Sequence, residues 1–389
     1  MSTVLITILG RTQSQGNYKK TPYTFPDGSV SDPVVFFGWE LWSRNQPDKT
    51  IVLGTSGSMW DNLIEPFADS DVEQYDFLNE AVKVQSVTQA QIDYFAEKLS
   101  HIHRRQVIFQ LISDAVSPSQ QISILESIEP LIDKGDEVIV DLTHGFRHIA
   151  VLILMAVVIL RSVKRVRIRA IYSSFHDTES GVTNVFDLAG LLSILDWQSA
   201  LYSFNKDGDP GVFAKLLADD GLDEDTQRKL KDASFLGRVL QHNNAWVAER
   251  TVANQLGQVK GISKLFVPYL QEHLARREDN PRAHRLTRIA RRHLEYGSFD
   301  RAAMLGLSAA QAAFAKENES LEKVHNELIQ DSRGDNQVRS AYHRLNAIRN
   351  AIAHTGNNWA NREVNKLLKS EVDLRQEFDR IFSILFSGI

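Results

Sequence analysis

Short runs of apolar residues alternate with helical patterns over the first half of the chain. The strand-length runs are rich in Val and Ile and cover residues 4–10, 50–55, 106–112, 136–143 and 166–174. Between several of them, apolar positions recur at helical spacing, as over residues 91–99, 122–132 and 146–163. Apolar strands separated by helices are typical of a mainly parallel sheet that is covered on both faces. The pattern predicts an α/β first domain over residues 1–190.

The strand pattern disappears after about residue 195. Residues 211–256 and 282–329 have helical periodicity with few clusters of β-branched residues. The clearest breaks are NKDGDPG at 205–211 and REDNPRA at 277–283, where Asp-Pro and Asn-Pro suit a turn that begins a helix. The sequence therefore predicts an all-α region over residues 191–389.

Composition narrows the classes of protein that fit. The 389 residues are enough for two cores, and the formal net charge of −5 provides no global basic field, so a nucleic acid would need a local patch. The absence of cysteine excludes disulfides, Cys-based zinc sites and thiol catalysis. The apolar run Ile149–Leu160 has 12 residues, whereas a membrane span needs about 20, and the N-terminus lacks a basic leader region. We expect a cytoplasmic protein without membrane contact.

Three predicted strands run into small polar, basic and aromatic residues. These are Gly10, Arg11, Thr12 and Tyr18 at the first end, Thr55, Ser56, Gly57, Ser58 and Trp60 at the second, and Asp141, Thr143, His144, Gly145, Phe146 and Arg147 at the third. In open parallel sheets, ligands bind beyond the carboxyl ends of the strands. Glycine allows close backbone approach, while hydroxyls, N–H groups and helix N-termini bind phosphate. Arg11 and Arg147 offer charge, and Tyr18, Trp60 and His144 offer faces for stacking a base. The pattern predicts a pocket for a phosphorylated, base-bearing ligand.

Other interpretations of these residues remain open. Thr143 alternatively serves only as a helix cap, and Asp141 fits the role of holding the loop better than direct contact. His144 and His148 have the i,i+4 spacing of metal ligands, but no H-E-x-x-H motif accompanies them, so we expect no metal. Neither G-x-G-x-x-G nor G-x-x-x-x-G-K-[ST] occurs, which argues against a dinucleotide cofactor and a P-loop NTPase.

The third cluster also carries a family resemblance. VDLTHGFRH at 140–148 resembles the D-x-T-H-G element of a family of CRISPR-associated accessory proteins, and LGTSGSMWD at 53–61 and GNYKKTPYTF at 16–25 resemble its other strand-end motifs. Such proteins join an N-terminal CARF domain, a Rossmann-like sensor of cyclic oligoadenylate, to a C-terminal helical HEPN domain. The resemblance implies a role in type III CRISPR immunity. It also implies an allosteric activator, expected to be cyclic tetra-adenylate, and no cofactor.

HEPN ribonucleases carry an R-x4-6-H signature, and LNAIRNAIAHTG at 345–356 matches it through Arg349, Asn350 and His354. Asn346, Asn350 and His354 recur every four residues along one helix stripe, while Arg349 lies about 140° from His354 and reaches the same site only through its length. This geometry suits a shallow site shared by two facing helices of a homodimer. His354 suits proton transfer, Arg349 suits charge stabilisation, and Asn350 suits orientation of the histidine or the phosphate.

The sequence thus predicts a cyclic oligoadenylate-activated, metal-independent endoribonuclease that acts on single-stranded RNA as a homodimer. Two alternatives stay open: a ligand-binding regulator without RNase activity, and a ring nuclease that degrades its activator in the first domain. A further basic feature comprises Arg282, Arg285, Arg288, Arg291 and Arg292, spaced along one predicted helix. It is interpreted either as a track for an RNA backbone or as a solvated helix face.

Overall fold

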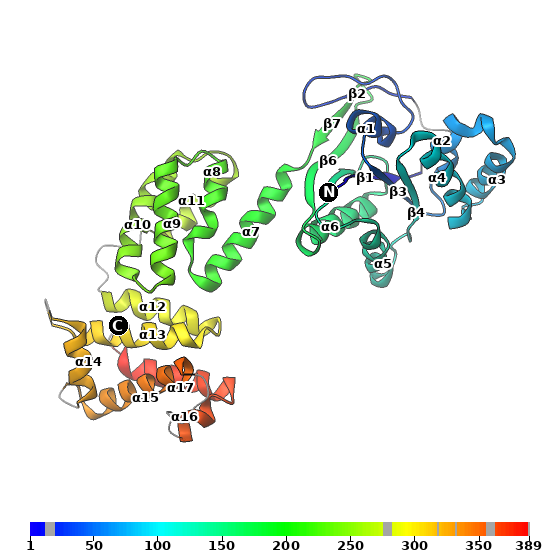
Figure 1. Cartoon of the computed structure of the whole chain (residues 1–389). Coiled ribbons are helices and arrows are strands. Elements are labelled where there is room, and N and C mark those ends of the chain that lie inside the picture. The colour runs from blue at the N-terminus through cyan, green and yellow to red at the C-terminus, as the bar shows by residue number, and fades with distance from the viewer. Residues whose placement is uncertain (12–19, 275–281, 317–318, 331–332, 355–361, 388–389) are drawn as a thin grey trace. The chain divides into compact units, whose positions relative to one another are not determined.

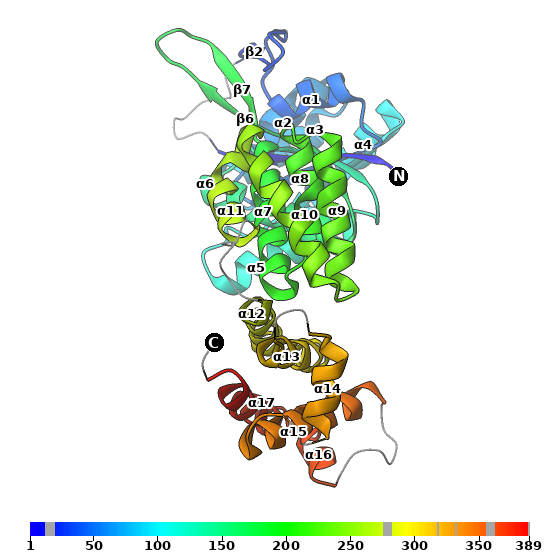
Figure 2. The same ribbon diagram turned by 90° about the vertical axis from the view of Figure 1, so that its left-hand side faces the viewer.

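The computed structural model describes residues 1–11, 20–274, 282–316, 319–330, 333–354 and 362–387. These residues form two compact units, Met1–Leu192 and Ser193–Ile389 (Figures 1 and 2). Each unit has its own hydrophobic core. No helix among the described residues is long and apolar enough to cross a membrane.

The first unit contains a seven-stranded sheet in the order β2-β7-β6-β5-β1-β3-β4. Its strands are β1 (Thr3–Leu9), β2 (Tyr23–Thr24), β3 (Lys49–Gly54), β4 (Gln106–Leu111), β5 (Glu137–Asp141), β6 (Arg167–His176) and β7 (Thr183–Asp187). Neighbours pair in parallel except β6 and β7, which are antiparallel. The predicted mainly parallel sheet is confirmed. The sequence pattern missed β2 and β7, because β2 has two residues and β7 has only two apolar residues, Val185 and Phe186, among its five.

Helices cover both faces of this sheet (Figure 1). They are α1 (Phe37–Asn45), α2 (Trp60–Ile64), α3 (Val72–Lys83), α4 (Gln89–His103), α5 (Pro118–Ile128) and α6 (Arg147–Val163). Because successive side chains of a strand point to opposite faces, Val4, Ile6 and Ile8 join the core with α5 and α6. Leu5 joins Phe37 of α1 on the other face. Two covered faces explain why β1 is apolar at nearly every position.

All secondary structure described beyond β7 is helical, which confirms the mainly helical prediction for this part of the chain. The α-helices are α7 (Gly190–Asp207), α8 (Ala214–Asp219), α9 (Glu224–Arg238), α10 (His242–Gln255), α11 (Val267–Leu274), α12 (Arg282–Glu295), α13 (Phe299–Phe314), α14 (Leu321–Ile329), α15 (Asn336–Ala353), α16 (Arg362–Leu367) and α17 (Glu371–Leu385). Short 3₁₀ helices occupy Glu65–Ser70, Glu129–Leu131, Pro210–Phe213, Leu256–Gln258 and Gly261–Leu265. One core gathers around Trp197 and Phe213, and another around Tyr342, Phe378 and Phe382.

Candidate functional site

The three polar strand ends of the first unit meet at one edge of the sheet. β1 pairs in parallel with β3 on one side and with β5 on the other, so Leu9, Gly54 and Asp141 end neighbouring strands in the same direction. On one side of β1 the strand order continues through β3 to β4, and the chain then returns to form β5 on the other side of β1. Such a reversal of strand order is where open α/β sheets form their ligand crevice. The sheet topology therefore brings together the three strand ends after which the described ligand candidates follow.

The loop after β3 is tied to the loop after β1 by hydrogen bonds. Ser58 Oγ donates to the Leu9 carbonyl at 2.8 Å and accepts from the Thr55 N–H at 2.9 Å. The Met59 N–H donates to the Gly10 carbonyl at 3.0 Å. Thr55 and Ser58 are buried. Both residues were predicted to contact a ligand, but Ser58 ties the two loops together and Thr55 bonds to Ser58 within the second loop.

Trp60 requires a correction, because it does not offer a face on which a base could stack. Its side chain is fully buried and packs in the core beside Phe109 at a ring-centroid distance of 5.6 Å. Its indole Nε1 donates to the Thr55 carbonyl at 2.9 Å. In this position the apolar ring is removed from water and its single N–H donor is hydrogen-bonded, so Trp60 anchors the loop to the core.

Two glycines let the strand-end loops pack closely. A Cβ at Gly10 would lie 1.6 Å from the His144 carbonyl oxygen, and one at Gly145 would lie 2.5 Å from Cγ2 of Ile8. Neither gap holds a methyl group. Packing between the loops therefore requires glycine at both positions, whether or not a ligand is bound.

Asp141 is fully buried at the end of β5 and braces the loop that follows. Its carboxylate accepts from Thr7 Oγ1 at 2.6 Å and from the Thr143 N–H at 2.9 Å. Burial raises the pKa of Asp141 to about 6, and the hydrogen bonds from Thr7 and Thr143 oppose that rise. The geometry gives Asp141 the loop-holding role rather than contact with a ligand.

His144 also faces inward, so its predicted stacking role needs correction. Its ring packs on Phe36 at a centroid distance of 5.3 Å, and its Nε2 accepts from the Phe37 N–H at 3.2 Å. Burial lowers the pKa of His144 to about 4, so the imidazole is neutral at pH 7. His148 points elsewhere, with Nε2 at 3.0 Å from the Asp114 carbonyl. Among the described residues, no group of three His, Asp or Glu side chains is placed to hold a metal.

The accessible part of this edge forms a rim around the buried loop contacts. Its members are half-buried or exposed: Arg11, Ser56, Gly57, Thr143, Gly145, Phe146 and Arg147. Phe146 is 42% exposed and supplies an aromatic ring, while Arg147 begins α6 and adds its charge to the helix N-terminus. Thr12 and Tyr18 lie outside the described residues. An anionic ligand with a stacking base would meet Arg11, Arg147 and Phe146.

The second candidate site lies on α15. Asp335 caps the helix by accepting from the Val338 N–H at 2.8 Å, and Tyr342, Leu345 and Ile348 bury one face. This buried face fixes the direction of the opposite, polar side. Asn350 and His354 lie near the carboxyl end of that side, and Arg349 lies between it and the buried face, about 100° from Asn350.

Arg349 and Asn350 are half-buried, and His354 is exposed, at the carboxyl end of α15. Arg349 Nη2 donates to Asn346 Oδ1 at 2.9 Å, which draws the guanidinium toward the asparagine stripe. His354 is exposed at the C-cap of α15, and its N–H donates to the Asn350 carbonyl at 3.0 Å. Thr355 and Gly356, which complete the matched segment, lie outside the described residues. The helix thus presents two amides and an imidazole along one stripe, and the Arg349 guanidinium reaches that stripe from beside it through its bond to Asn346.

The polar stripe of α15 extends further than the R-x4-H signature indicated. Arg339 and His343 precede Asn346 by seven and three residues, so both fall on the same side of the helix. Arg339 and His343 also border a surface hollow with Asn336 and Ser340. The recurrence of polar residues at helical spacing predicts Arg339 and His343 on this stripe. The R-x4-H signature does not include them.

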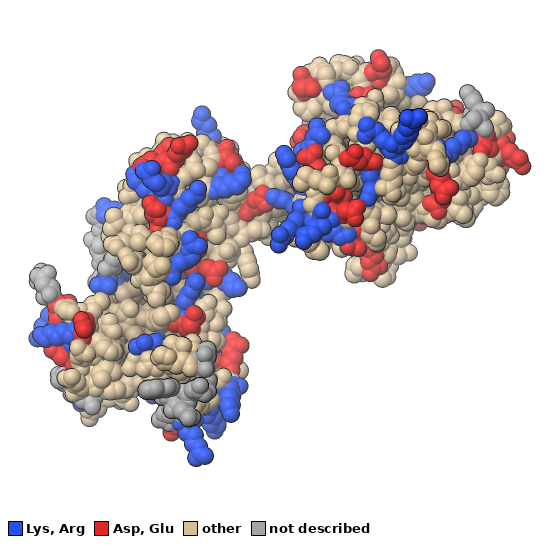
Figure 3. Space-filling view, in the orientation of Figure 1, with Lys and Arg blue, Asp and Glu red and all other residues tan. Residues whose placement is uncertain are grey.

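The basic face predicted on α12 is divided in the structure. Arg282, Arg288 and Arg291 are exposed, whereas Arg285 packs over the Trp246 ring at 4.7 Å and Arg292 over the Phe204 ring at 5.6 Å. Figure 3 shows basic and acidic side chains interspersed over each unit on the visible face. The five arginines therefore do not form a single continuous track.

Comparison with known proteins identifies the first unit. Residues 4–175 match the family model described as the CARF domain of the CRISPR system endoribonuclease Csx1. The first unit is a CARF domain. Its neighbouring strand ends and buried D-x-T-H-G loop are the features that carried the resemblance in the sequence. The match ends within β6 and does not reach β7, α7 or the later helices.

A curated relative supports the CRISPR association. The CRISPR-associated protein MJ1674 of Methanocaldococcus jannaschii is 24% identical over 288 residues, which are 66% of this chain and 44% of the relative. The chain thus spans less than half the length of that relative. Together with the CARF match, this bears out the resemblance to CARF-containing CRISPR accessory proteins.

Proposed function

We propose that this protein is an endoribonuclease of type III CRISPR defence that a cyclic oligoadenylate switches on through the CARF domain. The observation that carries the proposal is the arrangement on α15, where Arg349, Asn350 and His354 lie at an accessible helix end in a chain whose first unit is a CARF domain. The name of the matched family, CRISPR system endoribonuclease Csx1, points to the same activity. The helical region around α15 would act as a HEPN domain.

The activator would bind the rim of the CARF domain, and cyclic tetra-adenylate is the expected ring. Arg11 and Arg147 would pair with phosphates, and the half-buried Ser56 offers a hydroxyl at a neighbouring strand end. Phe146 would stack on an adenine. The buried contacts of Ser58, Trp60 and Asp141 would hold this rim in position before the ligand arrives.

A second copy of the chain would complete the site, and the surface of α6 supports this. Val151, Met155, Ile159 and Val163 recur every four residues and are 41–69% exposed. The opposite side of α6 carries Ile153 and Val157 in the core. A helix that is apolar on both sides needs a second partner to cover its outer stripe. An isologous dimer places the same stripe of two copies face to face.

Cleavage would proceed by proton transfer and charge stabilisation. Two copies of α15 would bring one His354 to accept the proton of a ribose 2′-hydroxyl and the other to protonate the leaving 5′-oxygen. As the 2′-oxygen attacks phosphorus and the bond to the 5′-oxygen breaks, Arg349 would stabilise the added negative charge. Only flexible single-stranded RNA lets a 2′-oxygen align with the leaving group, so it is the expected substrate.

The test measures cleavage of labelled single-stranded RNA by the full chain in EDTA, with and without cyclic tetra-adenylate. We expect activator-dependent cleavage that falls by about 10²-fold or more in His354→Ala, because general acid–base catalysis contributes that much. His325→Ala is a control within the same unit, since His325 is engaged with Tyr342 at 2.6 Å rather than exposed on the stripe. Cleavage that persists in His354→Ala would contradict the proposal.

The activator is followed in the same reactions. Activator binding without RNA cleavage in the wild type would favour a regulator without RNase activity. Loss of the cyclic activator without RNA cleavage would instead identify a ring nuclease. Hexa-adenylate serves as a second ring, because the pocket dimensions decide which ring fits.

A further inference from the structure

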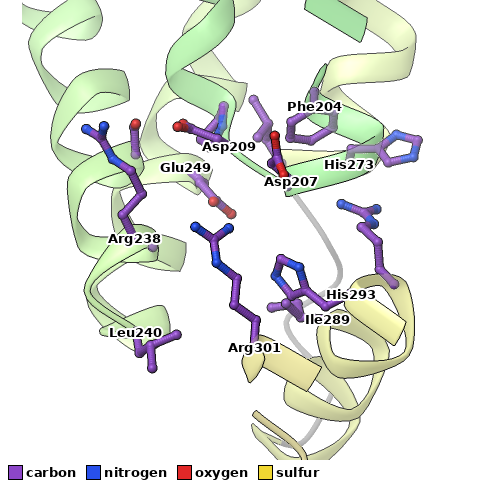
Figure 4. Close-up of a pocket in the computed structure, with 16 residues that line it drawn as sticks. Phe204, Asp207, Asp209, Arg238, Leu240, Glu249, His273, Ile289, His293 and Arg301 are labelled. Carbon is purple, nitrogen blue, oxygen red and sulfur yellow. The ribbon is translucent and has the colours of Figure 1, made fainter. Parts of the chain in front are cut away.

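A cavity of about 290 Å³ lies within the second unit, away from the α15 stripe (Figure 4). Its walls come from the end of α7, the turn that follows it, and α9 to α13. Small-molecule sites begin at about 300 Å³, so a ligand the size of one nucleotide suits it better than a dinucleotide. No residue described on α15 contributes to its wall.

Three arginines on three helices line the cavity: Arg238 of α9, Arg292 of α12 and Arg301 of α13. In the described part of the chain, none of these three guanidinium groups has a hydrogen bond or an ion pair. Most other arginines near carboxylates in this unit are paired, as Arg333 is with Glu319 and Arg344 with Glu377. Three unpaired guanidinium groups at one hollow provide donors that an anion would satisfy.

The position of Arg292 is set by its surroundings. A Cβ at Gly208 would lie 3.6 Å from Arg292 Nη1, and the guanidinium carbon lies 5.6 Å from the centre of the Phe204 ring. Gly208 has a φ of +69°, which turns the chain sharply between α7 and the following 3₁₀ helix. The glycine turn and the aromatic ring thus hold the charged group at the cavity wall instead of letting it extend into solvent.

Carboxylates line the same cavity, so the ligand must also carry hydrogen-bond donors. Asp207 lies at the end of α7 and has no hydrogen-bond or ion-pair partner among the described residues. Figure 4 shows Glu249 and Arg301 reaching toward the cavity from opposite walls. His273, held by its contact with the Tyr269 carbonyl at 2.7 Å, adds a flat ring. Cations, carboxylates and an aromatic ring together complement a phosphate, sugar hydroxyls and a base.

We propose that this cavity binds a single nucleotide unit through its phosphate, either a free nucleoside monophosphate or the 5′-phosphorylated end of an RNA strand. Arg238, Arg292 and Arg301 would surround the phosphate. Asp207 would accept hydrogen bonds from the ribose hydroxyls or a base amine. The site would be separate from the rim of the CARF domain and from the α15 stripe, and it does not depend on the proposed RNase activity.

The test is calorimetric titration of the full chain with AMP, adenosine and inorganic phosphate. We expect AMP to bind with one site per chain attributable to the cavity, and adenosine to bind at least about tenfold more weakly, since charge-assisted hydrogen bonds to its phosphate are missing. Arg292→Gln and Arg301→Gln should each weaken AMP binding by about tenfold or more. Arg288→Gln is the matched control, because Arg288 is exposed on α12 and does not line the cavity.

Two outcomes would overturn the proposal: undetectable AMP binding to the wild type at millimolar concentration, or equal affinity in the wild type and both cavity variants. The second outcome would place any AMP binding elsewhere. Thermal unfolding of each variant checks that the fold is retained. His354→Ala should bind AMP normally, which separates this site from the proposed nuclease. Titration with 5′-phosphorylated and 5′-hydroxyl forms of a diadenylate then distinguishes an RNA end from a free nucleotide.

Discussion

The two candidate sites place their polar residues in opposite environments. At the CARF edge, Ser58 and Asp141 are buried and bond to neighbouring loops. On α15, His354 is exposed and Arg349 is half-buried, and the core is built by other residues of the helix. Buried polar groups are costly unless satisfied, so the CARF loop depends on its internal contacts, whereas the helix end does not. Substitutions at the CARF edge should first change stability, and those on α15 should first change catalysis.

The largest expected effect is that of Gly10→Ala, because the new methyl group would lie 1.6 Å from the His144 carbonyl oxygen. We expect the free energy of unfolding of the CARF domain to fall by about 4 kcal/mol or more, or the domain to fail to fold. Gly57→Ala is the control, since its Cβ would meet only the flexible Gln85 side chain, nearest at Oε1 at 3.2 Å. Urea unfolding followed by tryptophan fluorescence measures both. Equal free energies of unfolding for the two variants would contradict the structural role of the tight contact at Gly10.

Arg349→Ala tests whether substitutions on α15 change catalysis more than stability. We expect the rate of RNA cleavage to fall by about 10²–10³-fold, because a charge-stabilising donor is lost. The free energy of unfolding should change by about 0.5 kcal/mol or less, as for most surface substitutions. Arg380→Ala provides an exposed arginine on α17 as a control for the rate. A large loss of stability in Arg349→Ala would show that the helix end is structural as well.

Burial of Asp141 should make the stability of the CARF domain depend on pH. Because burial raises its pKa from 3.8 to about 6, the folded CARF domain holds the proton more tightly than the unfolded chain does. This component of stability is present at low pH and is lost as pH rises from about 4 to 6, amounting to about 3 kcal/mol. Asp141→Asn removes it, so the variant should gain stability relative to the wild type across that window. The free energy of unfolding of both proteins is measured at pH 4 and pH 7. The same difference between variant and wild type at both pH values would contradict this prediction.

The smallest effect expected is that of Asp335→Ala, which removes the N-cap of α15. Loss of the 2.8 Å bond from the Val338 N–H should lower the free energy of unfolding of the second unit by about 1 kcal/mol. The cap is at the opposite end of α15 from His354, so the cleavage rate should be unchanged. A matching fall in rate would show that fraying at one end of α15 reaches the other.

The sequence predicted the elements with strong apolar patterns and missed those without one. The five Val- and Ile-rich runs became β1, β3, β4, β5 and β6, since strands covered on both faces need apolar residues at nearly every position. β7 escaped because only Val185 and Phe186 of its five residues are apolar, and it is recognised by its pairing with β6 and β2. The α15 stripe was predictable because helical periodicity is a local property of the chain.

Residue types and spacing alone determined that polar loops follow apolar strands and that Arg349, Asn350 and His354 share a helix. The neighbouring positions of β3, β1 and β5 were decided by the tertiary structure, since strand order depends on contacts between distant segments. Burial likewise separated Trp60 and His144, which face the core, from Phe146 and Arg147, which face solvent. Those four residues look equally suited to a ligand in the sequence. Only packing decides which side chains remain free to bind one, because a side chain that satisfies the core is no longer available at the surface.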